Sequence, residues 1–308
     1  FLITGMTGGI EHGAKINQRL AETAQAYGIP MGVGSQRLAL EHPEYAEIFA
    51  VKKTTPNVFL IANIGMSQLS DKKLALKYAQ DAGAMIDADA LAIHCNVIQE
   101  LVQYEGDRCF PDLIENIQYI CHNLQVPVII KEVGCGIDLE SAKTLVNAGV
   151  SCIDVGGKGG TSWAYIESQR NSNAQEQSIG ETFRDWGIPT AYSLSAIATE
   201  FHDRLKTDNL NLIATGGIRD GLTIAKAVAL GASVCGIGLS FFKAALISTE
   251  KVMETVETLE KQLKITMLAT NSQKLSDLSS KIVSAKPYAN YIDLRLQQLS
   301  PSGEFQND

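Results

Sequence analysis

Three glycine-rich turns in the second half of the chain have the composition of an anion-binding site. They are Gly156-Gly157-Lys158-Gly159-Gly160-Thr161, Gly216-Gly217-Ile218-Arg219 and Gly236-Ile237-Gly238-Leu239. Glycine lets backbone N–H groups approach an anion closely, and a helix N-terminus or an arginine such as Arg219 adds positive potential. One such turn is as easily a plain tight connection, but three in succession favour a phosphate cradle. They do not form a P-loop, because Lys158 is not followed directly by Ser or Thr.

Polar residues stand where apolar runs end. They are Ser35, Arg37, Asn63, His94, Lys131 and Thr215. Lys131 ends a run in which an ammonium group is costly to bury without a partner. One interpretation is a structural pair with Glu132 or with another carboxylate. The other is a cation beside the electron-rich N1–C2 edge of a flavin, where it stabilises the reduced ring, with Asn63 hydrogen-bonding the same ring or only closing a turn.

The segment around residue 100 brings further reactive groups together. It contains His94, Asn96, Gln99 and Glu100, followed by Glu105-Gly106-Asp107. His94 alone is more often a structural histidine, and Glu100 alone is more often a surface charge. Together they offer an imidazole, two amides and a carboxylate. One carboxylate with substrate oxygens and water commonly holds Mg²⁺ against a diphosphate, whereas the chain shows no three-ligand pattern for zinc or iron.

Eight short apolar runs, each followed by a helical pattern, must position these residues. They are Phe1–Thr4, Pro30–Gly34, Asn57–Asn63, Ala90–His94, Val126–Glu132, Ser151–Gly156, Leu210–Thr215 and Ser233–Gly236. Nearly continuous apolar runs are typical of parallel strands covered on both faces. Asp138 and Asp220 stand where two of the helices need N-caps. Eight βα units predict an α/β protein with a (β/α)₈ TIM barrel in which residues 1–308 form one domain.

An open doubly wound sheet is the main alternative fold. It requires a G-x-G-x-x-G fingerprint after the first strand, and Met6-Thr7-Gly8-Gly9 does not match it. Two connections, 95–109 and 171–187, are longer than normal, and long loops at the carboxyl end of a barrel are more often functional. The segment 252–268 has one apolar helical face and is expected to add a C-terminal helix that packs on the barrel or on another subunit.

The composition limits the possible partners and compartments. The formal net charge of the 308-residue chain is -8, which argues against nucleic-acid binding, and no apolar run is long enough for a transmembrane helix, so we expect no membrane partner. The six cysteines have neither C-x-x-C nor metal-finger spacing. They indicate a reducing, cytoplasmic setting, and most are expected to be buried and unreactive.

These residues resemble the type 2 isopentenyl diphosphate isomerases, which use FMN and Mg²⁺, over nearly the whole chain. The resemblance is carried by Met6-Thr7-Gly8-Gly9, Gly34-Ser35-Gln36-Arg37, Ala62-Asn63-Ile64-Gly65, His94-x-Asn96-x-x-Gln99-Glu100, Glu105-Gly106-Asp107, Lys131-Glu132-Val133-Gly134, Gly157-x-Gly159-Gly160-Thr161, Gly216-Gly217-Ile218-Arg219 and Met267-Leu268-Ala269-Thr270. Other FMN barrels share the glycine turns, whereas the His-Asn-Gln-Glu stretch is more specific.

The resemblance implies a role for each matching residue. The FMN is expected to contact Gly5, Met6, Thr7, Ser35, Asn63, Lys131 and Thr161, and its phosphate Gly216, Gly217, Arg219, Gly238 and Leu239. The substrate is expected to meet Ser35, Gln36, Arg37, His94, Asn96 and Gln99, with Gln99 and His94 as catalytic residues and Glu100 as the Mg²⁺ ligand. NADPH is expected to reduce FMN, and a homo-oligomer, a tetramer or an octamer, is expected from the family.

The chain departs from the family pattern at three places. Gly156 stands where Ser or Ala is common, which removes a possible side-chain bond to the flavin, and Tyr104 replaces a frequent Pro. The family's substrate-binding Arg-Lys pair has no counterpart after Phe1, which itself lies in an expected strand. We therefore expect an N-terminal substrate-binding segment upstream of Phe1.

The implied reaction converts isopentenyl diphosphate to dimethylallyl diphosphate, which needs an acid at one carbon and a base at another. The mouth predicted from the sequence offers amides, His94 and Lys131 but no poised pair of carboxylates, so reduced FMN is expected to act as the acid and base. An FMN-dependent oxidoreductase is the nearest alternative. Oxidation of a hydroxy acid would need a His base at the late strand ends, and residues 210–219 contain no His. Dehydrogenation of a nucleotide would need a nucleophilic Cys in a loop after the sixth strand, whereas Cys152 lies inside that strand. A flavin- or phosphate-binding scaffold without catalysis is the second alternative.

Overall fold

Eight parallel strands close into one barrel in the order of the chain. The computed structural model describes residues 1–6, 8–9, 12–103, 106–207 and 209–282. The strands are β1 (Leu2–Ile3), β2 (Met31–Gly32), β3 (Leu60–Gly65), β4 (Ala90–Cys95), β5 (Val128–Glu132), β6 (Cys152–Asp154), β7 (Asn211–Ala214) and β8 (Val234–Ile237), and β8 pairs with β1. Each lies in or overlaps one of the eight predicted runs, so the predicted (β/α)₈ barrel is confirmed, and the open sheet is excluded.

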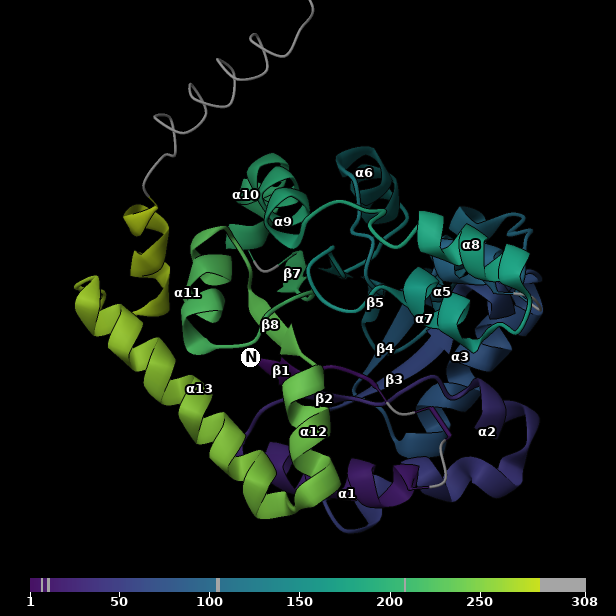
Figure 1. Ribbon diagram of the computed structural model, residues 1–308, viewed down its shortest axis with the longest axis horizontal. Coiled ribbons are helices and arrows are strands. Elements are labelled where there is room, and N and C mark those ends of the chain that lie inside the picture. The colour runs from purple at the N-terminus through teal and green to yellow at the C-terminus, as the bar shows by residue number, and fades with distance from the viewer. Residues whose placement is uncertain (7, 10–11, 104–105, 208, 283–308) are drawn as a thin grey trace, which may run out of the picture.

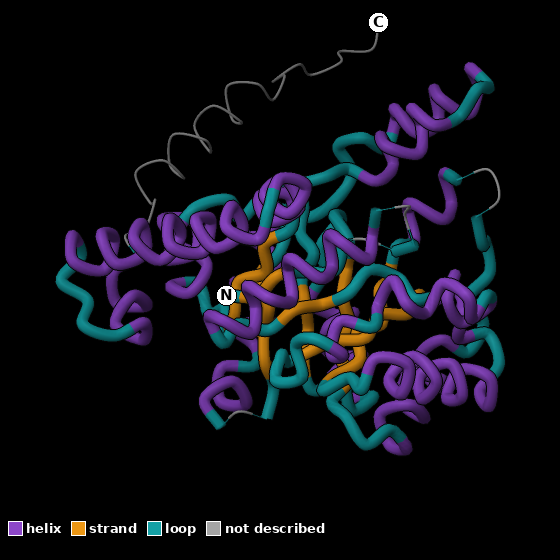
Figure 2. Tube along the Cα trace, turned by 90° about the horizontal axis from the view of Figure 1, so that it is seen from below, coloured by secondary structure: helices purple, strands orange, loops and turns teal. Residues whose placement is uncertain are grey.

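Helices surround the barrel on its outside (Figures 1 and 2). The α-helices are α1 (Gly13–Tyr27), α2 (Arg37–Glu41), α3 (Lys72–Ile86), α4 (Val97–Val102), α5 (Leu113–Asn123), α6 (Leu139–Asn147), α7 (Trp163–Arg170), α8 (Ala174–Thr182), α9 (Thr190–Glu200), α10 (His202–Lys206), α11 (Gly221–Ala229), α12 (Leu239–Ile247) and α13 (Thr249–Ala269). Short 3₁₀ helices are η1 (Pro43–Phe49), η2 (Val51–Lys53), η3 (Met66–Leu69) and η4 (Leu275–Lys281). None of these helices combines the length and apolar character needed to cross a membrane.

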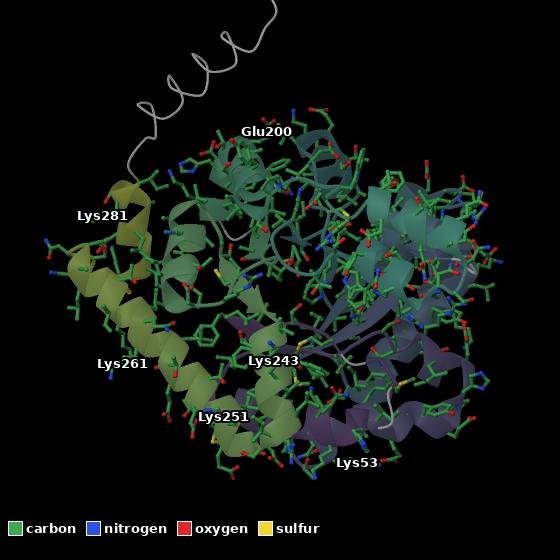
Figure 3. The ribbon with its side chains drawn as sticks, viewed as in Figure 1. Lys53, Glu200, Lys243, Lys251, Lys261 and Lys281 are labelled. Atoms are coloured by element: carbon green, nitrogen blue, oxygen red, sulfur yellow. The ribbon has the colours of Figure 1, made fainter. Side chains whose placement is uncertain are left out.

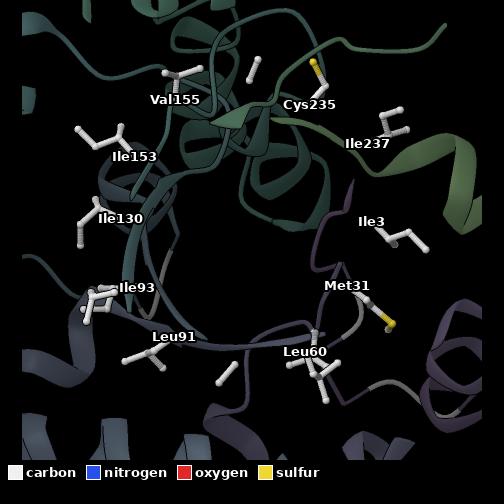
Figure 4. Packing of buried hydrophobic residues seen from close by; sticks show 14 of the residues in the cluster. Ile3, Met31, Leu60, Leu91, Ile93, Ile130, Ile153, Val155, Cys235 and Ile237 are labelled. Atoms are coloured by element: carbon white, nitrogen blue, oxygen red, sulfur yellow. The ribbon is translucent and has the colours of Figure 1, made fainter. Parts of the chain in front are cut away.

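The strands alternate between two buried layers. Outward-facing side chains such as Ile93, Ile130 and Ile153 pack between the sheet and the helices, where Figure 4 shows them outside the ring of strands. Inward-facing side chains form a smaller cluster made of Leu2, Ile61, Ala90, Ala92, Ile129, Cys152 and Ile213. Because successive strand residues point to opposite faces, this cluster fills the barrel and leaves the next inward positions, toward the carboxyl ends, for other residues.

The two long connections contain helices and are not open loops, which corrects the sequence-based expectation. Residues 95–109 include α4, and residues 171–187 include α8, whose first turn is capped by Asn173 through bonds to the N–H groups of Gln175 and Glu176. The helices α4, α7 and α8 contact one another beside the carboxyl end of the barrel. Both insertions therefore form one helical wall next to the predicted mouth.

The predicted C-terminal helix is confirmed as α13, which lies along α11, α12 and α1 (Figure 1). Val252, Val256 and Leu259 on its apolar face are buried. The Tyr27 hydroxyl donates to Glu257 at 2.7 Å and so links α1 to α13. The charged side chains of α13, such as those of Lys251 and Lys261, lie on the outer surface (Figure 3).

Two predicted N-caps are also confirmed. The Asp138 carboxylate accepts hydrogen bonds from the N–H groups of Glu140 and Ser141 at the start of α6. The Asp220 carboxylate accepts from the N–H of Thr223 at the start of α11. Hydrogen bonds to the ionised form lower the pKa of both carboxyl groups, the largest cause being the Ser141 hydroxyl for Asp138 and the Thr223 N–H for Asp220. These caps fix where the helices after strands five and seven begin.

Candidate active site at the carboxyl ends of the strands

A row of polar side chains covers the apolar interior of the barrel. The register pairs Gly65 with His94, His94 with Lys131, and Lys131 with Asp154 on neighbouring strands. Asn63, Lys131 and Asp154 line a small cavity together with Gly5 and the apolar floor. We call Asn63, His94, Lys131, Asp154 and Thr215 the polar row. The structure therefore brings together the predicted strand-end residues 63, 94, 131 and 215 and adds Asp154 to them.

His94 is held by Asn63 in one protonation state. Asn63 Nδ2 donates to the carbonyl of Val33 at 3.0 Å, so its Oδ1 faces His94 Nδ1 at 2.8 Å. An amide oxygen only accepts, and Nδ1 must therefore carry the ring proton, which leaves Nε2 as an acceptor. Burial and the neighbouring Lys131 charge lower the pKa of His94 to about 4. His94 is thus a neutral imidazole at neutral pH and offers a lone pair to a ligand.

Gln36 does not reach the mouth, which corrects its expected contact with the substrate. Its side chain is 0% exposed and donates to the carbonyl of Ala82 at 2.9 Å, while its oxygen accepts from the N–H of Asn63 at 2.9 Å. The Gln36 N–H also donates to the carbonyl of Asn63. Because the amide is satisfied on both sides, Gln36 holds Asn63 in place and has no group left for a ligand.

Ser35 and Arg37 flank Gln36 at the edge of the mouth. Ser35 is partly exposed and accepts the N–H of Arg37 at 3.5 Å. The Arg37 guanidinium is exposed and donates to Glu41 at 2.9 Å. Its pKa is raised by the Glu41 hydrogen bond and by the charges of Asp107 and Glu100. Arg37 therefore lies within electrostatic range of Glu100 and can turn toward an anion at the mouth.

Lys131 does not pair with the Glu132 carboxylate, one of the two interpretations of the sequence. Its Nζ donates to the main-chain carbonyl of Glu132 at 3.1 Å and shares the cavity with Asp154. The Glu132 carboxylate points to the other face of the strand and accepts the N–H groups of Gly134, Cys135 and Gly136. The cation therefore stays inside the barrel, and Glu132 organises the loop after β5.

A second group of polar side chains forms the acid cluster, which we define as Asn96, Gln99, Glu100 and Glu167 on and before α4 and α7. Glu100 is 9% exposed and accepts Asn96 Nδ2 at 2.9 Å and the N–H of Asp107 at 3.0 Å. Gln99 Nε2 donates to Glu167 at 2.8 Å, and Glu167 also accepts Arg170 at 3.3 Å. Glu100 is therefore a buried carboxylate, not a surface charge.

The structure adds two buried carboxylates for which no role was expected from the sequence. The Glu167 side chain is 5% exposed and accepts a hydrogen bond from Gln99, and Asp154 lies in the polar row. Asp154 could have been found from the strand alternation, because it is level with Lys131. Glu167 lies on α7, and nothing in the sequence distinguishes it from the other glutamates on helices.

The glycine turns after β6 and β7 pack against each other, and we call residues 156–160 and 216–217 the glycine cradle. A Cβ on Gly216 would lie 1.9 Å from the carbonyl oxygen of Gly157, and Gly216 and Gly217 both have positive φ angles, 99° and 83°. Arg219 donates to the carbonyl of Gly159 at 3.2 Å. Gly238 precedes the first turn of α12. Two bare backbone turns, an arginine and a helix N-terminus thus meet, as an anion site requires.

The remaining predicted flavin contacts lie around the same opening. A Cβ on Gly5 would be 2.0 Å from the carbonyl oxygen of Val33, and Met6 lies next to Gly238. Thr161 and Leu239 are exposed. Thr7, Tyr104 and Glu105 lie outside the described residues.

The departure at Gly156 has a steric reason. Its φ is 47°, and an added Cβ would meet the carbonyl oxygen of Glu132 at 2.0 Å. A serine or alanine there would require the end of β5 to move, so this chain keeps glycine where the family commonly has a side chain.

The thiols of Cys95, Cys135, Cys152 and Cys235 are unsuited to nucleophilic attack. All six cysteines are free, and burial raises the pKa of Cys135 and Cys235 to about 11, of Cys95 to about 12 and of Cys152 further still. Since the thiolate is the reactive form, these thiols are inert at neutral pH.

Comparisons with known proteins agree with this geometry. Residues 111–285 match the family model described as FMN-dependent dehydrogenase. A protein of Nostoc sp. named isopentenyl-diphosphate delta-isomerase is 44% identical over 277 residues, which cover 90% of this chain and 77% of the relative. Proteins of the same name from Stutzerimonas stutzeri and Rickettsia akari are 45% and 41% identical over 278 residues each, covering 90% of this chain and 78% and 79% of the relatives.

Solved structures support the fold. A mandelate oxidase mutant that carries a monooxide FMN adduct superposes with a TM-score of 0.59 at 17% identity, covering 90% of this chain and 76% of that one. A mandelate oxidase with benzoyl-formic acid gives a TM-score of 0.56 at 16% identity, with the same coverage. These likenesses are structural, whereas the extended sequence identity is specific, and the chain belongs to the isopentenyl-diphosphate delta-isomerase family.

Proposed function

We propose that this protein converts isopentenyl diphosphate to dimethylallyl diphosphate by a 1,3-allylic proton shift, with reduced FMN as acid and base and Mg²⁺ on the diphosphate. The observation that carries the proposal is the position of the acid cluster. Its amides and carboxylates follow β4 and β6, two of the strands that bear the polar row. A cluster able to bind a metal and orient a proton carrier thus adjoins a barrel mouth suited to a flavin phosphate.

The residues present fit FMN. An added Cβ at Gly156, Gly157, Gly216 or Gly217 would clash with backbone atoms of neighbouring residues. Arg219 and the α12 N-terminus supply positive potential, and the cavity above the apolar floor is lined by Asn63 and Lys131. When bound in its reduced form, FMN would supply the group that gives a proton to one carbon and takes one from another. The further residues in contact with it would be Gly5, Met6, Thr7, Ser35, Thr161, Gly216, Gly217, Gly238 and Leu239.

The residues also fit a magnesium ion held mainly by substrate. Asn96 Oδ1 is a buried oxygen without a hydrogen-bond partner among the described residues, and it belongs to the side chain that donates to Glu100. Each Glu100 oxygen accepts one hydrogen bond and keeps a lone pair for a cation. No described cluster holds three or more His, Cys, Asp or Glu side chains around a metal position. One carboxylate with diphosphate oxygens and water is the arrangement Mg²⁺ commonly takes.

The side chains around the substrate have distinct roles in this proposal. Gln99 is fixed by Glu167 on its amino side and by Asn96 Nδ2, at 3.3 Å, on its oxygen side, so its amide is oriented before substrate arrives. Neutral His94 keeps a lone pair on Nε2 that can accept a hydrogen bond. Arg37 and Ser35 meet the diphosphate at the rim. This orientation keeps the substrate carbons in one pose, which matters because both proton transfers need fixed distances.

The cellular setting belongs to the same proposal. We propose that NADPH reduces the FMN and that the enzyme works in the cytoplasm, which six unpaired cysteines support, since disulfides are rare in reducing compartments. A homo-oligomer, a tetramer or an octamer, is supported by the large apolar side chains exposed on α12 and α13, among them Leu246, Ile247 and Leu268. Light scattering of the purified protein measures this state.

Anaerobic incubation with FMN, Mg²⁺, NADPH and isopentenyl diphosphate tests the proposal. The expected result is dimethylallyl diphosphate, formed without stoichiometric consumption of NADPH. Oxidised protein should be much slower than photoreduced protein. Equal rates in both states would contradict the role of reduced FMN, stoichiometric redox turnover would favour an oxidoreductase, and a flavin-loaded protein that leaves the diphosphate unchanged would favour a binding scaffold.

A further inference from the structure

Asp154 is a buried carboxylate inside the barrel with no assigned role. Asp154 is the last residue of β6, is 2% exposed, and lines the same cavity as Lys131 and Asn63. Ionised carboxylates are rarely buried unless a cation or several donors accompany them. The register places Asp154 directly beside Lys131 on β5. The two side chains project from neighbouring strands to the same interior face.

The hydrogen bonds of Asp154 do not account for its charge. The Thr215 hydroxyl and the N–H of Gly156, at 3.2 Å, both donate to Oδ1. Oδ2 receives no hydrogen bond from any residue in the described part of the chain. An asparagine oxygen would accept the same two bonds, so the local turn requires an acceptor at this position but not a carboxylate.

The charge of Asp154 is instead matched by Lys131. The pKa of Asp154 is raised, mainly by burial, and the Lys131 charge and the Thr215 hydroxyl oppose that rise. Within the described part of the chain the Lys131 ammonium donates one hydrogen bond, to the carbonyl of Glu132, although an ammonium has three donors. His94, the other titratable neighbour on the polar row, is neutral and adds no compensating charge. Asp154 is therefore the carboxylate that lies beside Lys131 on the interior face, and the two groups interact electrostatically.

We propose that Asp154 is a positioning residue for the Lys131 ammonium at the FMN site and limits the positive charge that a bound flavin would experience. The inference rests on the FMN site of the proposed function and not on the isomerase reaction. A bare ammonium in a low-dielectric cavity favours the anionic reduced ring strongly, and an adjacent carboxylate that attracts the ammonium weakens that effect. The pair thus sets how easily the flavin is reduced and how basic the reduced ring is.

The reduction potential of protein-bound FMN tests this role. In Asp154→Asn the hydrogen-bond acceptor remains and the negative charge is lost. The expected result is at least a tenfold shift toward reduced flavin at a fixed potential, equivalent to about 30 mV for a two-electron couple. In Lys131→Met the potential should move in the opposite direction. In the Lys131→Met background, adding Asp154→Asn should have a smaller effect than in the wild type.

Two further variants keep the test decisive. Asp138→Asn makes the same chemical change at the N-cap of α6, where Asn also caps, and should leave the potential unchanged. Thr215→Val removes the hydroxyl that stabilises the Asp154 charge and should move the potential in the same direction as Asp154→Asn by less. It tests the idea even if Asp154→Asn fails to fold.

The outcomes separate this inference from the proposed function. A wild-type protein that does not bind FMN would overturn the proposed flavin site and this inference with it. FMN binding with an unchanged or lowered potential in Asp154→Asn would overturn the inference alone. An equal effect of Asp154→Asn with and without Lys131 would also overturn it, because Asp154 would then act on the flavin directly and not through Lys131.

Discussion

The glycine cradle and the acid cluster lie at the same end of the barrel but are built from different parts of the chain. The cradle is backbone: at Gly216 an added Cβ would lie 1.9 Å from a neighbouring carbonyl oxygen. The acid cluster is side chain: Asn96, Gln99, Glu100 and Glu167 bond one another across α4 and α7. A backbone site binds an anion common to many flavoproteins, whereas a side-chain site can be specific for one reaction. This difference explains why other FMN barrels share the glycine turns, whereas the His-Asn-Gln-Glu stretch is more specific to one family.

The largest expected effect comes from adding one methyl group to the cradle. Gly216→Ala requires a side chain at φ 99° and a clash with Gly157, so the two turns must separate. We expect FMN affinity to fall at least about 100-fold, on the order of 3 kcal/mol. Titration of the protein with FMN, followed by quenching of flavin fluorescence, measures the change.

A matched control uses the same substitution in a helix. An added Cβ on Gly83 in α3 has nothing within 4 Å. Gly83→Ala should leave FMN affinity unchanged and stabilise the fold by roughly 0.5–1 kcal/mol, because alanine is the better helix former. If Gly216→Ala bound FMN as tightly as this control, the cradle would not be the phosphate site.

The next effect breaks the acid cluster and leaves the cradle intact. Glu100→Gln removes the charge proposed to hold Mg²⁺ and turns a donor toward the N–H of Asp107 or Asn96. We expect kcat/KM for isopentenyl diphosphate to fall about 100-fold, about 2.7 kcal/mol, with weaker dependence on Mg²⁺ and unchanged FMN affinity. Glu140→Gln, on the exposed face of α6, is the control and should retain full activity. A similar loss in both variants would exclude a specific role for Glu100.

A third effect is a dependence of stability on pH that arises from His94. Its pKa falls from 6.5 to about 4 on folding, so the unfolded chain takes up the proton first as the pH drops. The contribution of neutral His94 is complete above pH 6.5 and is lost between pH 6.5 and 4, on the order of 2 kcal/mol for this partly exposed ring. Urea unfolding of FMN-free protein across this range measures it. His94→Gln should flatten this part of the profile, and an unchanged slope would mean that other groups cause it.

The smallest expected effect comes from removing the N-cap of α11, the helix that follows the second turn of the cradle. Asp220→Ala removes the cap of α11 and should lower the free energy of unfolding by about 1 kcal/mol without changing FMN affinity. Asp220→Ser should restore most of the lost stability, as measured by thermal unfolding. A large loss of FMN affinity in Asp220→Ala would show that the cradle depends on the α11 cap, in contrast to the steric argument above.

Much of the site could be predicted because strands and turns leave local signals. The eight apolar runs fixed the barrel, and strand ends therefore identified Asn63, His94 and Lys131 as neighbours at one mouth. Glycine clusters marked the cradle. The roles of Gln36 and Glu167 could not be predicted. The family motif assigned Gln36 to the substrate, whereas its amide donates to the carbonyl of Ala82. Glu167 contacts Gln99, which is 68 residues away in the sequence.

The sequence by itself determined the order of the elements, the barrel and the chemical types at its mouth, since these follow from eight apolar runs separated by helical patterns and from glycine's freedom of backbone conformation. Only the tertiary structure decided which carboxylates are buried, which protonation state His94 keeps, and that Lys131 faces Asp154 and not the Glu132 carboxylate. The physical reason is that charge and proton positions depend on burial and on neighbours from distant segments, and both exist only after the barrel closes.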